Sequence, residues 1–294
     1  MARPRRQTEE NIALVGFGNW GTALACALTE AGTPPQTIFV RQLHGEDLRR
    51  ARKLGVPLVK MGPSGHPRGP LAAEVLWICT PDSAIAATAR AFAQARWTHA
   101  RPIVLHSSGA LSSAELDSLR DACHASVASV HPLMSFPLRA ASPLRGVPFA
   151  LEGDPRAVRM ATRIVHRLGG DPFQIRARDK TLYHAFGAFA SPLVTTLLTA
   201  ALAVGRAAGI PPATAMRRMR PMVERTMKNF FEQGPVRSLS GPVARGDAAT
   251  VAGHMNALRA HPGPLEIYRA LQRYSVETLP RSNKTALRKV LAGP

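Results

Sequence analysis

The stretch IALVGFGNWGTALACAL, residues 12–28, predicts the fold of the N-terminal half of the chain. It begins as a short apolar strand, turns through glycines and continues as an amphipathic helix. Gly16, Gly18 and Gly21 have the spacing G-x-G-x-x-G. The first glycine permits a tight turn, the second lets a pyrophosphate approach the backbone, and the third lets the helix lie close to the strand. The stretch therefore predicts a dinucleotide site; the alternative is a glycine-rich turn that binds nothing.

The helix that follows the turn favours phosphate binding, because its free N–H groups and the positive end of its dipole face the ligand. We expect the whole turn to contact the cofactor. Its residues are Gly16, Phe17, Gly18, Asn19, Trp20 and Gly21.

The composition is that of a globular chain long enough for two domains, with 294 residues of which 45% are hydrophobic. The net charge of +19 suggests a nucleic-acid partner, but aromatic residues make up only 5% of the chain. Zinc-finger spacing and RNA-binding aromatic motifs are missing, and the arginines are spread over the whole sequence. We therefore expect no nucleic-acid partner, and instead an attraction for small anionic ligands.

Three scattered cysteines predict neither a disulfide framework nor a metal cluster, which favours the reducing cytoplasm. Residues 1–10 are predicted to be a disordered basic tail, without the apolar region of a signal peptide. Residues 185–205 carry no charge and are just long enough to span a bilayer. Because they contain Pro192 and are rich in Ala and Thr, we interpret them as a buried helix and expect no membrane partner.

Strands and helices alternate in the first part of the sequence, and only helices are predicted after it. Expected strands cover residues 12–15, 37–40, 74–79, 102–106, 126–130, 147–152 and 172–175, and residues 43–70 are expected to hold one helix and a loop. Expected later helices cover 179–208, 212–233 with a kink at Pro221, 247–260, 264–278 and 282–291. The pattern predicts an α/β domain of Rossmann type, with a mostly parallel sheet, at 11–177, and an all-α domain at 178–294.

The end of the second predicted strand indicates which cofactor the site would take. A carboxylate there would bond the ribose 2′-OH of NAD, but the sequence offers Arg41 instead. The planar guanidinium matches the oxygens of a 2′-phosphate. We therefore expect NADP; the alternative is an ordinary surface arginine in a basic chain.

Polar residues follow three other predicted strands, at the edge where ligands lie in such sheets. Thr80, Pro81 and Asp82, with Ser107 and Ser108, are expected to border the cofactor, although Asp82 reads equally well as a helix N-cap. His106 and His131 are candidate substrate-binding groups at the rim of the site. Each of the two, taken singly, also fits a structural role.

The start of the first C-terminal helix carries the candidate catalytic groups. Lys180 and His184 are four residues apart and share one helix face, which Ser191 continues as a candidate substrate contact. Reduction of a carbonyl or imine needs a proton donor at the heteroatom, and Lys180, Tyr183 or His184 is suited to that task. The alternative is a solvated helix start. Arg245 is a further candidate for holding an anionic substrate, and Asp247 for capping a helix.

These motifs together resemble a bacterial oxidoreductase family that joins a Rossmann-like domain to domain of unknown function 2520. The more specific marks are Lys180-x-x-Tyr183-His184 and Gly241-Pro242-x-x-Arg245-Gly246-Asp247. The family is similar to the 6-phosphogluconate dehydrogenase superfamily and to pyrroline-5-carboxylate reductase. The resemblance implies NADP binding, reductase activity on a small molecule, and a homodimer formed through the helical domain.

One position departs from the family pattern. The helix after Tyr183-His184 carries Ser191-Pro192 where the family has Ser-Asn, so an amide side chain that would bind substrate or nicotinamide is missing. The expected function is hydride transfer between NADPH and a small keto acid, hydroxy acid or imine. The alternative is a catalytically silent dinucleotide-binding dimer that acts as a sensor or regulatory partner.

Overall fold

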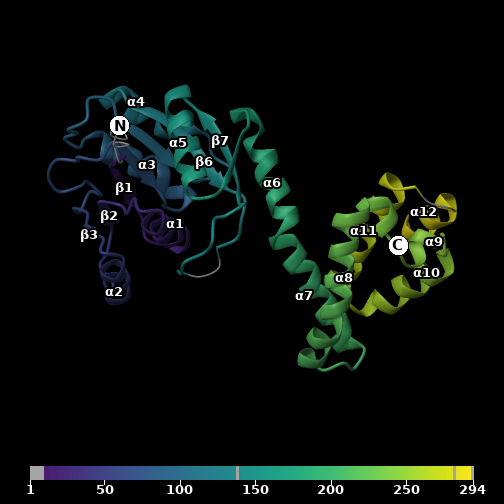
Figure 1. The fold of residues 1–294 in the computed structure, drawn as a ribbon. Coiled ribbons are helices and arrows are strands. Elements are labelled where there is room, and N and C mark those ends of the chain that lie inside the picture. The colour runs from purple at the N-terminus through teal and green to yellow at the C-terminus, as the bar shows by residue number, and fades with distance from the viewer. Residues whose placement is uncertain (1–9, 137–138, 281–282, 293–294) are drawn as a thin grey trace, which may run out of the picture. The chain divides into compact units, whose positions relative to one another are not determined.

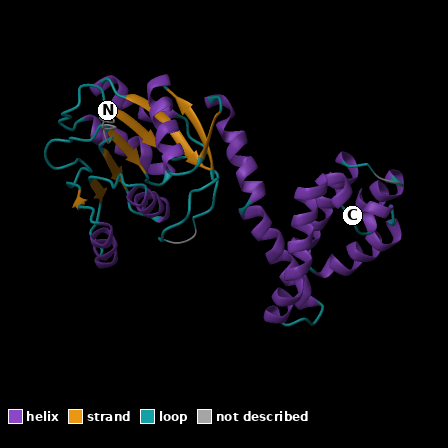
Figure 2. Cartoon of the chain, in the orientation of Figure 1, coloured by secondary structure: helices purple, strands orange, loops and turns teal. Residues whose placement is uncertain are grey.

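The computed structural model describes residues 10–136, 139–280 and 283–292, and most of the predicted basic tail lies outside these residues. The chain divides into two compact units, Met1–Ala188 and Phe189–Pro294. The first holds a mostly parallel sheet with helices, and the second is helical (Figures 1 and 2). The α/β and all-α order predicted from the sequence is confirmed.

The first unit is built on one eight-stranded sheet with the order β3-β2-β1-β4-β5-β6-β7-β8. The strands are β1 (Ile12–Val15), β2 (Thr37–Val40), β3 (Leu58–Lys60), β4 (Val75–Ile78), β5 (Ile103–His106), β6 (Ser126–Pro132), β7 (Pro148–Gly153) and β8 (Asp171–Gln174). All neighbouring pairs are parallel except β6 and β7. The carboxyl ends of β1, β4, β5 and β6 therefore meet at one edge.

Helices cover both faces of this sheet, which explains why its central strands are continuous apolar runs. Successive residues point to opposite faces, so Trp77 joins a cluster with Leu24 of α1, whereas Ile78 joins a cluster with Phe92 of α3. The helices of this unit are α1 (Asn19–Glu30), α2 (Gly45–Leu54), α3 (Asp82–Ala93), α4 (Asp117–Cys123), α5 (Pro155–Arg167) and α6 (Lys180–Ala190), the last reaching the division between the units.

One strand, β3, was not predicted from the sequence. β3 lies inside the region predicted as a helix and a loop, and it pairs in parallel with β2 at the sheet edge. Its three residues are half-buried or exposed, so they lack the continuous apolar pattern of the central strands. Short edge strands of this kind carry little periodic signal.

The second unit packs its helices around a small core of its own. Its helices are α7 (Pro192–Ala207), α8 (Pro212–Ser238), α9 (Pro242–Arg245), α10 (Ala248–Ala257), α11 (Pro262–Thr278) and α12 (Lys284–Ala292). The core is formed by Val243, Val251, Met255, Val276, Leu287 and Leu291.

Two details of the predicted helices were wrong. The helix expected over 179–208 is divided at Ser191, because Pro192 starts a new helix at a position where its missing N–H costs nothing. Pro221 lies inside α8 and does not break it, whereas the backbone leaves the helical conformation at Gly234, with φ 75° and ψ 173°, directly after the predicted helix end at residue 233. Glycine adopts positive φ readily, so the break falls there.

The helical stretch Ala177–Ala207 is long and apolar enough to cross a membrane by length and composition alone. A single helix of this kind is weak evidence for a membrane span. None of its most apolar window is buried in this chain, so the interpretation of residues 185–205 as a buried helix was wrong for the single chain.

Candidate active site

The glycine turn has the geometry that its sequence predicts. Gly16 has φ +101°, and a Cβ there would lie 2.8 Å from the Cys79 carbonyl oxygen. A Cβ on Gly21 would lie 2.2 Å from the Gly16 carbonyl oxygen, so α1 approaches the turn too closely for any side chain. A Cβ on Gly18 would meet no protein atom within 4 Å. The second glycine therefore faces open space, where a pyrophosphate could approach the backbone.

The N-terminus of α1 is free to bind an anion. Its first turn holds no acidic residue, and no side chain caps its N–H groups. The unpaired N–H groups and the helix dipole suit a phosphate. Arg41 follows β2 and is exposed, the position at which it was predicted to meet a 2′-phosphate.

A pocket of about 170 Å³ lies at the carboxyl ends of the central strands, next to this turn. It is lined by Trp20, Cys79, Thr80, Asp82, Ser107, His131, Pro132, Met134 and Phe136. Five of these were predicted site residues. Met134 and Phe136 were not predicted, because they lie in a mostly apolar stretch after β6 in which no residue type indicates a binding role.

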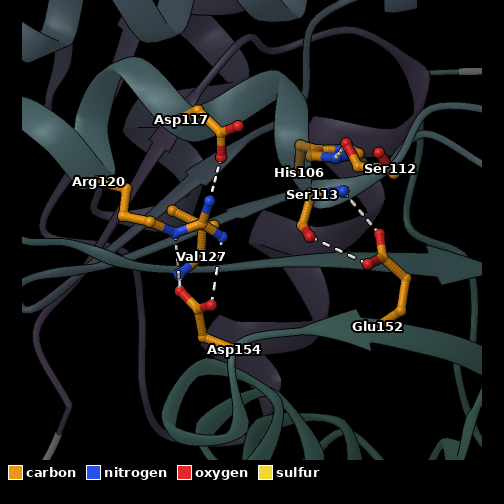
Figure 3. Close-up of polar contacts among 8 residues, drawn as sticks. All are labelled: His106, Ser112, Ser113, Asp117, Arg120, Val127, Glu152 and Asp154. Atoms are coloured by element: carbon orange, nitrogen blue, oxygen red, sulfur yellow. Dashed lines mark hydrogen bonds and ion pairs between the residues drawn. The ribbon is translucent and has the colours of Figure 1, made fainter. Parts of the chain in front are cut away.

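His106 was predicted at the rim of the site, and this prediction was wrong because the residue is buried. Its side chain is 0% exposed, and its Nε2 lies 3.0 Å from the carbonyl oxygen of Ser112 (Figure 3). Its Nδ1 accepts the N–H of Ser108 at 3.1 Å. With Nδ1 as acceptor, Nε2 carries the proton and donates it to Ser112. Burial lowers the pKa of His106 to about 4, so it is a neutral residue that shapes the loop after β5.

A buried carboxylate holds the far end of the same loop. Glu152 on β7 accepts the Ser113 N–H at 2.6 Å and the Ser113 hydroxyl at 3.0 Å (Figure 3). Asp154, just after β7, accepts the Val127 N–H at 2.8 Å and pairs with Arg120. These bonds fix the loop between β5 and α4 against the sheet.

Lys180 reaches this network from the first turn of α6. Its side chain is 1% exposed, and its Nζ donates to the Ser108 carbonyl oxygen at 3.0 Å and to Ser129 Oγ at 2.7 Å. Burial lowers the pKa of Lys180 to about 8, while the charges of Glu152 and Asp82 act in the opposite direction. These bonds attach the first turn of α6 to the sheet of the first compact unit.

Tyr183 and His184 complete the cluster on the next turn of α6. The hydroxyl of Tyr183 lies 2.9 Å from His131 Nδ1, and the rings of His131 and His184 meet edge to face with centroids 6.1 Å apart. A Cβ on Gly109 would lie 2.7 Å from His184 Cδ2 and 2.8 Å from His131 Nε2. Glycine at position 109 therefore lets both histidines approach the loop.

The ionisation of this cluster follows from its burial. Burial lowers the pKa of His131 to about 4, helped by the charge of Lys180. Burial also raises the pKa of Tyr183 to about 12. At neutral pH His131 is therefore uncharged and Tyr183 keeps its proton.

Two predicted substrate residues belong to the second unit and remain predictions. Ser191 precedes α7, and Arg245 ends α9 and is exposed. The expected cap of Asp247 is confirmed, because its carboxylate accepts the Thr250 N–H at 3.0 Å at the start of α10.

Comparisons with known proteins support this fold. Residues 147–275 match the family model described as domain of unknown function DUF2520. No curated protein matches the sequence. A "putative NADP oxidoreductase" from Bacteroides fragilis is 18% identical, with TM-score 0.73 over 90% of this chain and 97% of that one.

Two further solved structures are similar. A reductive aminase from Aspergillus terreus, in complex with NADPH and ethyl-5-oxohexanoate, is 14% identical, with TM-score 0.63 over 96% of this chain and 99% of that one. A pyrroline-5-carboxylate reductase from Coxiella burnetii is 14% identical, with TM-score 0.55 over 91% and 98%. At these identities the likeness shows the fold, which this chain shares with NAD(P)-dependent reductases.

Proposed function

We propose that this chain, whose residues 147–275 match the DUF2520 family model, is an NADP-dependent oxidoreductase. Its substrate would be a small keto acid, hydroxy acid or imine. One observation carries the proposal: the pocket beside the open glycine turn is lined by His131, which Tyr183 and His184 contact from α6. Titratable groups gathered at the carboxyl ends of parallel strands are where such folds place their chemistry.

The glycine turn and Arg41 would hold the cofactor. Gly18 leaves room for the pyrophosphate, the N-terminus of α1 would attract it, and the Arg41 guanidinium would bond the 2′-phosphate. NADPH, when bound, supplies the hydride.

Residues of α6 would control proton transfer to the substrate. Because Tyr183 keeps its hydrogen, its hydroxyl can donate to His131 Nδ1, which leaves the proton of neutral His131 on Nε2. That N–H lies beside Gly109 and close to His184. In this arrangement His131 orients the substrate heteroatom, and His184, which is exposed, delivers the proton. Lys180, whose ammonium is buried, positions the loop and adds positive charge.

The proposal is tested by calorimetric titration with NADPH and with NADH. We expect Arg41→Ala to weaken NADPH binding by about tenfold or more, since charged hydrogen bonds contribute about 1.5–3 kcal/mol, and to leave NADH binding nearly unchanged. Arg90→Ala, an exposed arginine near the end of α3, is the matched control. Binding of neither cofactor by the unmodified protein would overturn the proposal.

Gly18→Ala separates binding from folding. A Cβ on Gly18 meets no protein atom, so the melting temperature should fall by only a few degrees, the cost of alanine at the N-cap of α1, while NADPH affinity falls about tenfold. An unchanged affinity would mean that the pyrophosphate does not approach this turn.

We also propose that the chain forms a homodimer through its helical unit. Phe189, Met222 and Phe231 are 71%, 67% and 80% exposed, an unusual amount of apolar surface for a lone chain. Sedimentation equilibrium should give twice the mass of one chain. A monomer at micromolar concentration would contradict this proposal without affecting the cofactor site.

A second function is favoured by Ser191-Pro192, where the family pattern that the sequence resembles has Ser-Asn, so that an amide side chain for substrate or nicotinamide is missing. Without that contact, the chain would bind a dinucleotide without turnover and act as a sensor. NADPH binding without oxidation by any member of a carbonyl and imine panel would support this alternative.

A further inference from the structure

Ser107 is held in an unusual hydrogen-bonding position at the end of β5. Its Oγ accepts the indole N–H of Trp20 at 2.7 Å and that of Trp77, also at 2.7 Å. Trp77 is 0% exposed on the central strand β4. The Trp20 ring packs against Phe136, with ring centroids 4.9 Å apart. Both donors are therefore fixed by the packing of the sheet and of α1.

Because two indoles donate to it, the Ser107 hydroxyl can form a further hydrogen bond only as a donor. An indole N–H is a donor only, and a hydroxyl has two acceptor positions and one donor. Both acceptor positions of Ser107 are filled, so its own hydrogen is the group left to be satisfied. Among the residues that the structure describes, none receives that hydrogen. Ser107 is half-buried and lines the pocket.

We infer that Ser107 is an obligatory hydrogen-bond donor toward the pocket, and that it recognises a carbonyl or carboxylate oxygen of a bound ligand. The inference rests on the proposed function, in which that oxygen belongs either to the carboxamide of the cofactor or to the substrate. A ligand group that only donates hydrogen bonds, such as an ammonium, finds no acceptor on this residue.

Asp82 contributes a hydrogen-bond acceptor to the same pocket, whereas Ser107 contributes a donor. Its Oδ2 accepts the Ser108 hydroxyl at 2.8 Å, and an ionised carboxylate can only accept hydrogen bonds. The pocket therefore offers one fixed donor and one fixed acceptor. A group with both a carbonyl oxygen and an N–H or O–H suits it best, which describes a carboxamide or a hydroxy acid.

The test must avoid a simple loss of folding. Ser107→Ala alone would leave the buried Trp77 N–H without a partner, at a cost of about 1–3 kcal/mol. We therefore compare Trp77→Phe with the double variant Trp77→Phe/Ser107→Ala. The first keeps the serine hydroxyl and the Trp20 indole and frees one acceptor position of Ser107, whereas the second removes the hydroxyl in the same background. Thermal unfolding checks that the two have the same stability to within a few degrees.

Binding is measured by calorimetry with two probes. One is NADPH, and the other is oxamate, a stable mimic of a keto acid, titrated with and without NADP⁺. The double variant should bind one probe about three- to tenfold more weakly than Trp77→Phe, the effect of one neutral hydrogen bond. Weaker NADPH binding assigns the oxygen to the cofactor, and weaker oxamate binding assigns it to the substrate.

Equal affinities of the two variants for both probes would overturn the inference. Failure of the unmodified protein to bind NADPH would overturn the proposed function instead, and the oxamate titration without cofactor would still decide the role of Ser107. If the unmodified protein binds neither probe, the inference falls as well.

Discussion

Two sides of the loop after β5 use their polar groups in opposite ways. On the closed side, the polar groups are bonded to the protein itself; its residues are His106, Ser108, Ser113, Glu152 and Lys180. On the open side, polar groups face or adjoin the pocket; its residues are Asp82, Ser107, His131, Tyr183 and His184. The comparison distinguishes residues that build the site from residues that can meet a ligand.

Two adjacent serines show the contrast most directly. The Ser108 hydroxyl accepts the N–H groups of Ala110 and Leu111 and donates to Asp82, so its bonding capacity is used within the protein. The Ser107 hydroxyl accepts from two tryptophans and has its donor left over. Polar residues at a strand end are thus not equivalent, and the partners of each hydroxyl decide whether it supports the fold or faces a ligand.

The largest expected effect concerns stability on the closed side. Glu152→Ala removes the two hydrogen bonds that the buried carboxylate accepts from the Ser113 N–H and hydroxyl, and should lower the free energy of unfolding by about 3 kcal/mol. Urea unfolding measures the change. The exposed Glu224→Ala, on α8, is the control and should cost less than about 1 kcal/mol. If Glu152→Ala lowers the free energy of unfolding no more than Glu224→Ala, the bonds of the closed side do not stabilise the fold.

The next effect concerns activity on the open side. His184→Ala should lower turnover about 100-fold if His184 delivers the proton, equivalent to about 2.7 kcal/mol, with little change in stability because the side chain is exposed. The rate of NADPH oxidation with the first active carbonyl or imine substrate measures it. Thr181→Ala, exposed on the same helix, is the control. Unchanged turnover would remove His184 from the mechanism.

The third effect is a pH dependence that belongs to the closed side. Burial lowers the pKa of His106 to about 4, whereas an unfolded histidine titrates near 6.5. Between these values the unfolded state binds the extra proton, so stability falls as the pH falls. From pH 7 to pH 5 the unmodified protein should lose about 2 kcal/mol more than His106→Asn. Urea unfolding at both pH values compares the two proteins, in which His131 contributes equally. Equal losses of unfolding free energy in the two proteins would show that His106 is not buried as described.

The sequence predicted the frame of this site, because the signals of the frame are local. The apolar runs of β1, β4 and β5 and the spacing of Gly16, Gly18 and Gly21 report strands and a turn without reference to distant residues. Since parallel strands end at one edge, the residues after them could be placed near one another.

The direction of each side chain beyond the strand end could not be predicted. Alternation holds within a strand, and it ends at His106, where β5 pairs with Ser129 of β6. Whether the next residues face the pocket depends on Trp77, Asp82 and Lys180, which are distant in sequence. The role of Gly109 is hidden for the same reason, because the histidines that exclude its side chain come from β6 and α6.

The smallest expected effect tests the residue that joins the two sides. Asp82 lines the pocket and accepts the Ser108 hydroxyl, and it lies in the first turn of α3, where the helix dipole favours its charge. Asp82→Asn keeps an acceptor oxygen for Ser108 and removes the charge, so stability should fall by only about 0.3–1 kcal/mol. Asp82→Ala removes the acceptor as well and should cost about 1 kcal/mol more, the contribution of the bond to Ser108. Urea unfolding of both variants measures the two contributions separately. If the two substitutions cost the same, Ser108 gains nothing from Asp82, and the closed and open sides are independent rather than joined through this carboxylate.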